Sequence, residues 1–226
     1  MIESLLCDDN CIISGPIRPN IITPVEEYIT FVDSAVKALC VANWGSNGEI
    51  TYEQATAVTD LGSVFTNNTS IISFDELRFF TGLTLLNKES FTNCINLSSI
   101  ILPDSIQSFE NGDPEMNGCF YGCTCLPLIN IPNTVSLIGN QTFVNCANLS
   151  SINIPSLVIS IGDYAFYGCT GLTSVIVEAT TPPTLGTNVF TNDTNLTHIH
   201  VPSASVDTYK AAIGWSEYAS IISAIV

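Results

Sequence analysis

A pattern of apolar residues recurs within residues 143–177, and it constrains the fold of this chain more than any other feature of the sequence. Phenylalanine, cysteine, leucine and two aliphatic residues return after 23 residues at the same spacings. The two copies are Phe143, Cys146, Leu149, Ile152 and Ile154, and Phe166, Cys169, Leu172, Val175 and Val177. A repeat of this length with matched apolar positions is typical of solenoids, in which each unit buries its apolar face against its neighbours. We therefore predict a stack of similar units.

The pattern extends to five copies, which begin at Phe91, Phe120, Phe143, Phe166 and Phe190. Each copy has leucine six positions later and aliphatic residues nine and eleven positions later. The last two positions alternate with a period of two, which predicts one short strand with its apolar side inward. The spacing of three and three between phenylalanine and leucine predicts a helical turn on the opposite wall. The predicted fold class is α/β, a solenoid with one short strand plus a helical turn in each repeat of about 23 residues.

Four segments follow from this pattern. Residues 1–28 contain three prolines and no helical period, and we expect an extended N-terminal arm. It is either a mobile terminus or a peptide that docks on another chain. Residues 29–82 are expected to form a helical N-terminal cap, residues 83–202 the repeat array, and residues 203–226 an amphipathic C-terminal cap that closes the end of the stack.

The N-terminal cap contains two predicted helices joined by a loop that resembles a degenerate EF-hand calcium loop. Thr51 and Gln54 have the spacing of a capping box and mark the start of the second helix. In the loop, residues 43–54, Gly45 occupies the place of the first aspartate and Gln54 that of the final glutamate. Because few carboxylates remain in register, we expect the loop to pair the helices rather than bind calcium. No metal and no other cofactor is predicted.

Nine cysteines cannot all pair within one chain. Four of them occupy the same place in successive repeats, namely Cys94, Cys123, Cys146 and Cys169. Equivalent side chains of a ladder run parallel to one another, so we expect buried thiols there rather than disulfides. Cys119 and Cys125 flank the ladder and are the cysteines for which a disulfide is expected first. Cys7 and Cys11 have no second ligand pair in the sequence, so a zinc site is not expected.

The chain has 5 Lys and Arg against 21 Asp and Glu, which gives a formal net charge of −16. Such a surface repels nucleic acid and anionic membranes, which are bound mainly through lysine and arginine contacts to phosphate. No apolar run has the roughly 18 residues that a membrane helix needs. We expect neither nucleic-acid binding nor membrane insertion, and the remaining partner classes are proteins and neutral glycans.

The first residues of the sequence contain no basic segment and no apolar core, so they do not have the form of a signal peptide. Two locations remain open at this point. In a trimmed mature form the protein is extracellular or on the cell surface. If it does not use the secretory route, it belongs to an assembly such as a virion.

Residues suited to catalysis are few. The two histidines, His198 and His200, project from the outer face of the last predicted strand, and the sequence places no third metal ligand beside them. Glu110, Asp113 and Glu115 lie in an insertion at residues 107–118 that is expected to form a protruding, solvated loop, with attraction of a cation as the alternative. No nucleophile, carboxylate pair or phosphate-binding loop is marked by its spacing. We predict that the chain is not an enzyme.

The outward positions of the predicted strands define the candidate binding surface. Strand alternation places them in two rows of hydroxyls, amides, imidazoles and isolated aliphatic side chains without a charge. A neutral stripe on an acidic solenoid suits recognition of a protein or a glycan, and the alternative is that uncharged strands simply favour stacking. The candidate partner-binding residues are Ser99, Ile101, Leu128, Asn130, Ser151, Asn153, Ser174, Ile176, His198 and His200.

The repeat core IGDYAFYGCTGLTSV, with Ile-Pro after several strands, resembles the BspA-type (Treponema pallidum-type) leucine-rich repeat over residues 71–202. The tail VPSASVDTYKAAIGWSEYASII resembles the closing segment of Bacteroidetes members of this family. The resemblance implies a right-handed leucine-rich-repeat solenoid without a cofactor, and a role in adhesion to host proteins, matrix or other cells. The chain departs from the pattern at Asp193 in place of cysteine, at Glu178 in place of proline, and in the 107–118 insertion.

Two functional hypotheses follow. In the first, the chain is a non-enzymatic adhesion or recognition module that binds a protein or glycan through the exposed strand face. In the second, it is a structural or host-recognition component of a phage virion or another large assembly, docked by residues 1–28.

Overall fold

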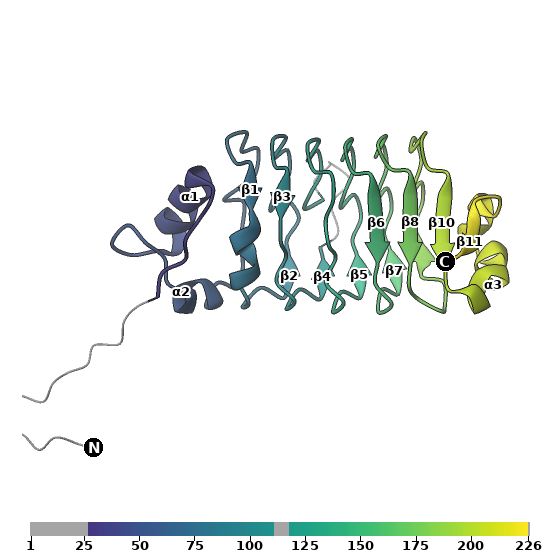
Figure 1. Cartoon of the computed structure of the whole chain (residues 1–226), viewed down its shortest axis with the longest axis horizontal. Helices are drawn as coiled ribbons and strands as arrows, with labels where there is room; N and C mark the ends of the chain where they lie inside the picture. Colours follow the sequence, from purple (N-terminus) through teal and green to yellow (C-terminus); the bar gives the residue numbers. More distant parts are fainter. Residues whose placement is uncertain (1–26, 111–117, 226) are drawn as a thin grey trace, which may run out of the picture.

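The computed structural model describes residues 27–110 and 118–225. Figure 1 shows an elongated solenoid whose repeats lie side by side along the long axis, with helical segments at both ends. All the pairs between named strands are parallel, as expected when each turn of the chain lies on the one before it. The predicted α/β solenoid is confirmed.

The first wall of the solenoid contains four of the five strands that the sequence predicted, and also a strand in the C-terminal cap that it did not predict. Near the N-terminal end, β1 (Ser73–Phe74) pairs with β3 (Ser99–Ile100). Further along, β6 (Ser151–Ile154), β8 (Ser174–Val177), β10 (His198–Val201) and β11 (Ile222–Ala224) form a four-stranded sheet. Along β6, β8 and β10, every second residue is buried in the core, and the residues between them face outward.

A second wall consists of five strands that the sequence did not predict. They are β2 (Leu85–Leu86), β4 (Ser108–Phe109), β5 (Leu137–Ile138), β7 (Ser160–Ile161) and β9 (Thr184–Leu185), paired in that order. Each strand has only two residues, which is too short to leave a period-two signal in the sequence. Most repeats therefore contribute two short strands rather than one.

The segment from phenylalanine to leucine forms the third wall as a series of turns. In the first copy the backbone N–H of Cys94 donates to the Phe91 carbonyl, and the N–H of Leu97 donates to the Cys94 carbonyl. A residue with positive φ interrupts each segment directly before the cysteine ladder, for example Asn93 (φ 57°) and Gly122 (φ 71°). Because asparagine and glycine adopt this left-handed conformation most readily, their presence limits the predicted helical turn to a single turn.

The core is a continuous stack of aromatic rings. Neighbouring rings of Phe65, Phe91, Phe120, Phe143, Phe166 and Phe190 have centroids 5.2–5.4 Å apart and interplanar angles of 2–21°. The stack thus begins at Phe65, one unit before the expected array boundary at residue 83. In that unit Asn68 stands in the place of the ladder cysteine and Ile71 in the place of the leucine.

Helical segments close both ends of this core. The N-terminal end has α1 (Ser34–Trp44), α2 (Tyr52–Thr56) and η1 (Asp75–Phe79). The predicted capping box is confirmed, since Thr51 Oγ1 accepts from the Gln54 N–H and Gln54 Oε1 accepts from the Thr51 N–H. The C-terminal end has η2 (Ser203–Ser205), α3 (Val206–Ala211) and η3 (Trp215–Tyr218), followed by β11.

Two side chains of the C-terminal segment donate hydrogen bonds to backbone carbonyls at residues 179 and 183, after β8. Trp215 Nε1 donates to the Pro183 carbonyl and Tyr209 Oη to the Ala179 carbonyl, both at 2.7 Å.

Among the described residues, no helix combines the length and the apolar character required to cross a lipid bilayer.

Candidate recognition face

The outward residues of the first wall form the candidate site, which we call the strand face. In the register of the sheet, Ser174 of β8 lies between Ser151 of β6 and His198 of β10. The next outward residue, Ile176, lies between Asn153 and His200 in the same way. The structure therefore brings six of the ten candidate residues together as two parallel rows.

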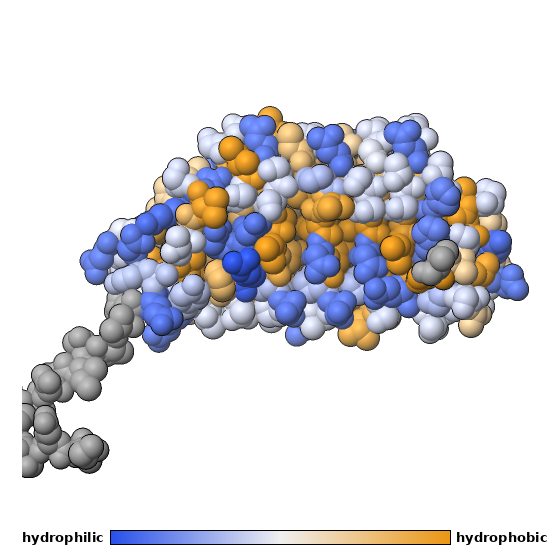
Figure 2. Space-filling view, viewed as in Figure 1, coloured by the Kyte–Doolittle hydropathy of each residue, from blue (hydrophilic) through white to orange (hydrophobic). Residues whose placement is uncertain are grey.

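Apolar side chains protrude from this face along the solenoid. The exposed fractions are 39% for Ile101, 59% for Leu128 and 36% for Ile176. Figure 2, viewed as in Figure 1, shows apolar surface in a band along the molecule with polar side chains between the apolar patches. Exposed aliphatic groups framed by hydroxyls and amides suit contact with a partner surface, because their burial releases water while the polar groups can form hydrogen bonds.

The remaining candidates lie in a less regular part of the wall. Ser99 pairs with Ser73 in the short β1–β3 sheet, and Ile101 follows that sheet. Leu128 and Asn130 lie in segment 126–132, which joins no named strand. The two rows are therefore regular only from β6 onward.

Two acidic side chains lie beside these candidates, so the expectation of a face without charge is wrong. Glu178 Oε1 accepts from Asn153 Nδ2 at 2.8 Å, and Asp75 Oδ1 accepts from Ser99 Oγ at 2.5 Å. Glu178 follows Ser174 and Ile176 at the same spacing of two, so extending the alternation by one step would have found it. Asp75 belongs to η1, and its contact depends on the tertiary fold.

The two histidines stack on each other at the C-terminal end of the face. Their ring centroids are 5.6 Å apart with an interplanar angle of 17°. His198 Nδ1 lies 2.8 Å from Thr197 Oγ1, and His200 Nδ1 lies 3.1 Å from Ser223 Oγ. Ser223 comes from β11, a strand within the C-terminal cap that the sequence did not predict. The partners of both rings are hydroxyls, as suits polar surface residues.

The cysteine ladder is buried in the core and does not contribute to the strand face. Cys94, Cys123, Cys146 and Cys169 are free thiols, as predicted, and each donates from Sγ to the carbonyl of a phenylalanine in the preceding repeat. Burial raises the pKa of Cys94 to about 12. A buried thiol with a raised pKa is a poor nucleophile, so the ladder is structural.

The cysteines expected to pair first do not form a disulfide. Cys119 is buried and Cys125 is half-buried, and both are free thiols. Burial raises the pKa of the Cys119 thiol. Cys7 and Cys11 lie outside the described residues.

The side chains considered as metal ligands are engaged elsewhere where the structure describes them. Glu49 forms an ion pair with Lys37 at 2.7 Å, and Gln54 Nε2 donates to Ser46 Oγ at 2.9 Å. Glu110 Oε2 accepts from the Lys88 N–H at 2.9 Å. In residues 27–110 and 118–225, no three His, Cys, Asp or Glu side chains are grouped to hold a metal ion. Asp113 and Glu115 lie outside these ranges.

Comparison with known proteins bears on the fold of this chain. The family described as BspA type Leucine rich repeat region matches residues 50–112 and 116–216 in six copies. No curated protein matches the sequence. Among solved structures, the Treponema pallidum leucine-rich repeat protein is 21% identical with a TM-score of 0.50, and the match covers 64% of each chain.

Two further solved structures are similar. A leucine-rich cell surface protein from Faecalibacterium prausnitzii is 24% identical with a TM-score of 0.44, and the match covers 64% of this chain and 34% of that one. A leucine-rich repeat protein from Bacteroides ovatus is 15% identical with a TM-score of 0.23, covering 58% and 59%. The matched part of each of these three structures is less than two thirds of its length.

Proposed function

Because the chain belongs to the BspA-type leucine-rich repeat family, we propose that it is a non-enzymatic recognition module that binds a protein or glycan through its strand face. The observation that carries the proposal is the pair of rows on β6, β8 and β10, in which hydroxyl, amide, imidazole and aliphatic groups lie in register. Rows in register present side chains at an even spacing on successive strands, and stacked repeats form extended binding surfaces in this way. An extracellular or cell-surface location would suit such a role.

Two properties of the surface support a protein or glycan partner. The net charge of −16 and the acids Asp75 and Glu178 oppose binding of nucleic acid or of an anionic membrane. The exposed Ile101, Leu128 and Ile176 supply apolar contacts that hydroxyl and amide rows alone do not.

The test uses a panel of immobilised extracellular-matrix proteins and neutral oligosaccharides. The unmodified chain is screened first, and each positive is measured again with Ile101→Asp and Ile176→Asp. A carboxylate at either position adds a desolvation cost in the interface, and we expect affinity to fall at least about tenfold. Leu157→Asp is the matched control, because Leu157 is 57% exposed and lies after β6 rather than on the strand face.

We expect the control variant to bind like the unmodified chain. Equal loss with all three variants would contradict the proposal, since the effect would then come from the added charge alone. Unchanged binding by the two strand-face variants, or a panel without any positive for the unmodified chain, would also contradict it.

The alternative, a structural or host-recognition component of a virion or other large assembly, depends on residues 1–28. Residues 1–26 of that arm lie outside the described part of the chain. No described residue favours the virion hypothesis, and it stays a prediction from the sequence.

A further inference from the structure

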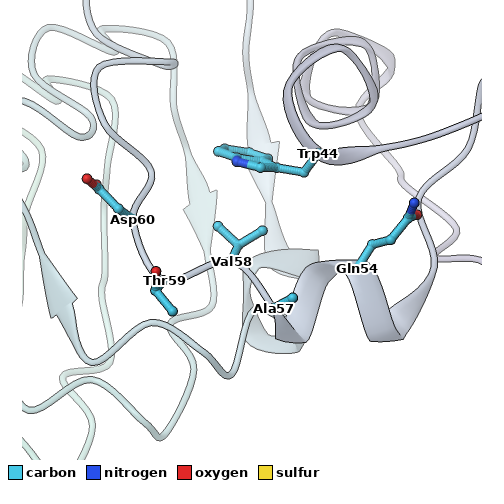
Figure 3. A pocket seen from close by; sticks show the side chains of 6 residues that line it. All are labelled: Trp44, Gln54, Ala57, Val58, Thr59 and Asp60. Carbon is cyan, nitrogen blue, oxygen red and sulfur yellow. The ribbon is translucent and has the colours of Figure 1, made fainter.

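A cavity of about 380 Å³ lies between the end of α1 and the segment that contains α2 and the residues after it, and it shares no residue with the strand face. Its lining comes from the last residue of α1, from α2, and from the chain that follows α2. Figure 3 shows the indole of Trp44 over Val58, with Gln54 and Asp60 toward opposite ends. The lining residues are Trp44, Gln54, Ala57, Val58, Thr59 and Asp60.

The apolar part of the cavity is one aromatic ring facing a small aliphatic floor. Trp44 is half-buried and packs against two core rings, with centroid distances of 6.3 Å to Phe65 and 5.9 Å to Phe80. These contacts hold the indole in place while part of it borders the cavity. Ala57 and Val58 form the surface opposite the ring.

The polar part of the cavity contains hydrogen-bonding groups that have no partner among the described residues. The Trp44 indole N–H has no hydrogen-bond acceptor among the described residues. Asp60 Oδ1 accepts from the Gly62 N–H and from Asn87 Nδ2, both at 2.6 Å, which fixes the carboxylate and leaves Oδ2 without a described donor. The exposed hydroxyl of Thr59 is a further polar group in the lining of the cavity.

The cavity is held by backbone packing and does not need to form on binding. A Cβ at Gly82 would lie 2.3 Å from the Thr56 carbonyl oxygen and 2.6 Å from that of Val58, so the chain at Gly82 packs directly beneath the floor. Gln54 is fixed by its bonds to Thr51 and Ser46. A preorganised site loses less conformational entropy when a ligand binds.

We propose that this cavity binds a single neutral sugar ring. A sugar presents an apolar face of C–H groups for the indole and the exposed Ala57, and hydroxyls that accept from the indole N–H and donate to Asp60 Oδ2. The volume is at the small end of the range for ligand pockets, which suits one ring. An anionic ligand is opposed by Asp60 and by the net charge of −16. A quaternary ammonium group is favoured by a cage of several aromatic rings, and only one ring lines this cavity.

The test follows the two indole N–H resonances in ¹H–¹⁵N NMR spectra of the full chain. The chain has two tryptophans, and the N–H of Trp215 is buried and bonded to Pro183, so it serves as an internal control. The probes are the methyl glycosides of glucose, galactose, mannose, N-acetylglucosamine and N-acetylgalactosamine, with choline as the cationic comparison. We expect at least one glycoside to shift the Trp44 resonance saturably with a Kd of the order of millimolar, as one ring in a shallow pocket allows.

Two variants and one control locate the contact. Thr59→Val and Asp60→Asn each remove one polar group, and we expect each to weaken binding several-fold, while Asp207→Asn in the C-terminal cap leaves it unchanged. Ile176→Asp on the strand face also leaves it unchanged, which separates this site from the proposed recognition face. The proposal is overturned if no glycoside moves the Trp44 resonance at tens of millimolar, if only choline does, or if both resonances shift together.

Discussion

At the N-terminal end of the solenoid, the carboxylate of Asp33 accepts hydrogen bonds from four backbone N–H groups. Oδ1 caps α1 through Ala35 and Val36, and Oδ2 accepts from Ile72 and Ser73 beside β1. At the C-terminal end, Asp193 occupies the place of the ladder cysteine, and neither of its oxygens has a hydrogen-bond partner within the described residues. The N-terminal end of the solenoid thus contains a carboxylate with four hydrogen-bond donors, and the C-terminal end contains a buried carboxylate without one.

This difference gives the two carboxyl groups opposite pKa shifts. Burial alone would raise the pKa of Asp33, but its four backbone donors outweigh burial and lower the pKa below the usual range. Burial raises the pKa of Asp193 to about 8. The pKa of an acid at the end of the array therefore depends both on how deeply the carboxyl group is buried and on how many backbone N–H groups donate to it.

The largest difference between the two ends is expected from their tryptophans. Trp215→Ala removes a fully buried ring and its bond to the Pro183 carbonyl, and we expect a loss of about 3–5 kcal/mol in the free energy of unfolding. Trp44→Ala should cost less, because Trp44 is half-buried and its N–H has no partner among the described residues. Urea denaturation of both variants measures the comparison, and an equal or larger loss for Trp44→Ala would contradict it.

The second prediction concerns the pH dependence of the C-terminal end. The folded pKa of Asp193, about 8, lies above its ordinary value of 3.8, so the folded state holds the proton more tightly than the unfolded state. The contribution of Asp193 to the free energy of unfolding is fully present below pH 4. It is lost as the pH rises toward 8, and the free energy of unfolding falls by up to about 1.4 kcal/mol per pH unit. Denaturation at a series of pH values should show this decline in the unmodified chain.

Asp193→Cys restores the ladder residue and is the matched variant for this prediction. It should remove the decline between pH 4 and pH 8 and stabilise the protein most at the alkaline end of that window. If the variant retained the full pH dependence, another group would be responsible for it.

The third prediction concerns Asp33→Ala at the N-terminal end, where the contribution to stability depends on pH in the opposite direction to that of Asp193. The substitution leaves four backbone N–H groups without their acceptor, and we expect a loss of about 1–2 kcal/mol at neutral pH, the upper range for a helix cap. Because the pKa of Asp33 is lowered in the folded state, its contribution is present above about pH 4 and is lost as the pH falls through the folded pKa. The difference in stability between the unmodified chain and the variant should therefore shrink in acid. Asp33→Asn keeps one acceptor oxygen and should lie between the two.

The smallest effect is expected from the capping box of α2. Thr51→Ala removes the acceptor for the Gln54 N–H and should cost about 1 kcal/mol, whereas Thr51→Ser keeps the hydroxyl and should cost little. Thermal unfolding of the two variants measures the difference. If both variants lost the same stability, packing of the threonine methyl group rather than capping would hold the start of α2.

The sequence predicted those parts of the fold that repeat. The positions of Phe143, Cys146 and Leu149 recur with enough copies to define the stack, and alternation at Ile152 and Ile154 defines β6. The two-residue strands of the second wall, such as β7 at Ser160–Ile161, are too short to produce a period. The Phe65 unit was not recognised because it has Asn68 in place of the cysteine, Ile71 in place of the leucine, and Phe74 and Glu76 in place of the two aliphatic residues.

The candidate site was predicted as far as it depends on strand alternation. The neighbours Ser151, Ser174 and His198 follow from the 23-to-24-residue repeat. Ser223 and Asp75 contact the strand face from elements outside the predicted strands, so no local spacing in the sequence predicts these contacts. The cavity at Trp44 was also missed, because the end of α1 and the residues after α2 come together there only in the folded chain.

The claim that the strand face is the recognition surface is tested most directly by a footprint of the bound partner. Hydrogen–deuterium exchange is compared for the chain alone and for its complex with the strongest binder from the panel of matrix proteins and oligosaccharides. We predict slower exchange confined to the strand face, on the strands β3, β6, β8 and β10 with the residues that directly follow β3, and on the segment around Leu128. Slower exchange on the turns at residues 143–149 and 166–172, with these strands unchanged, would contradict the claim.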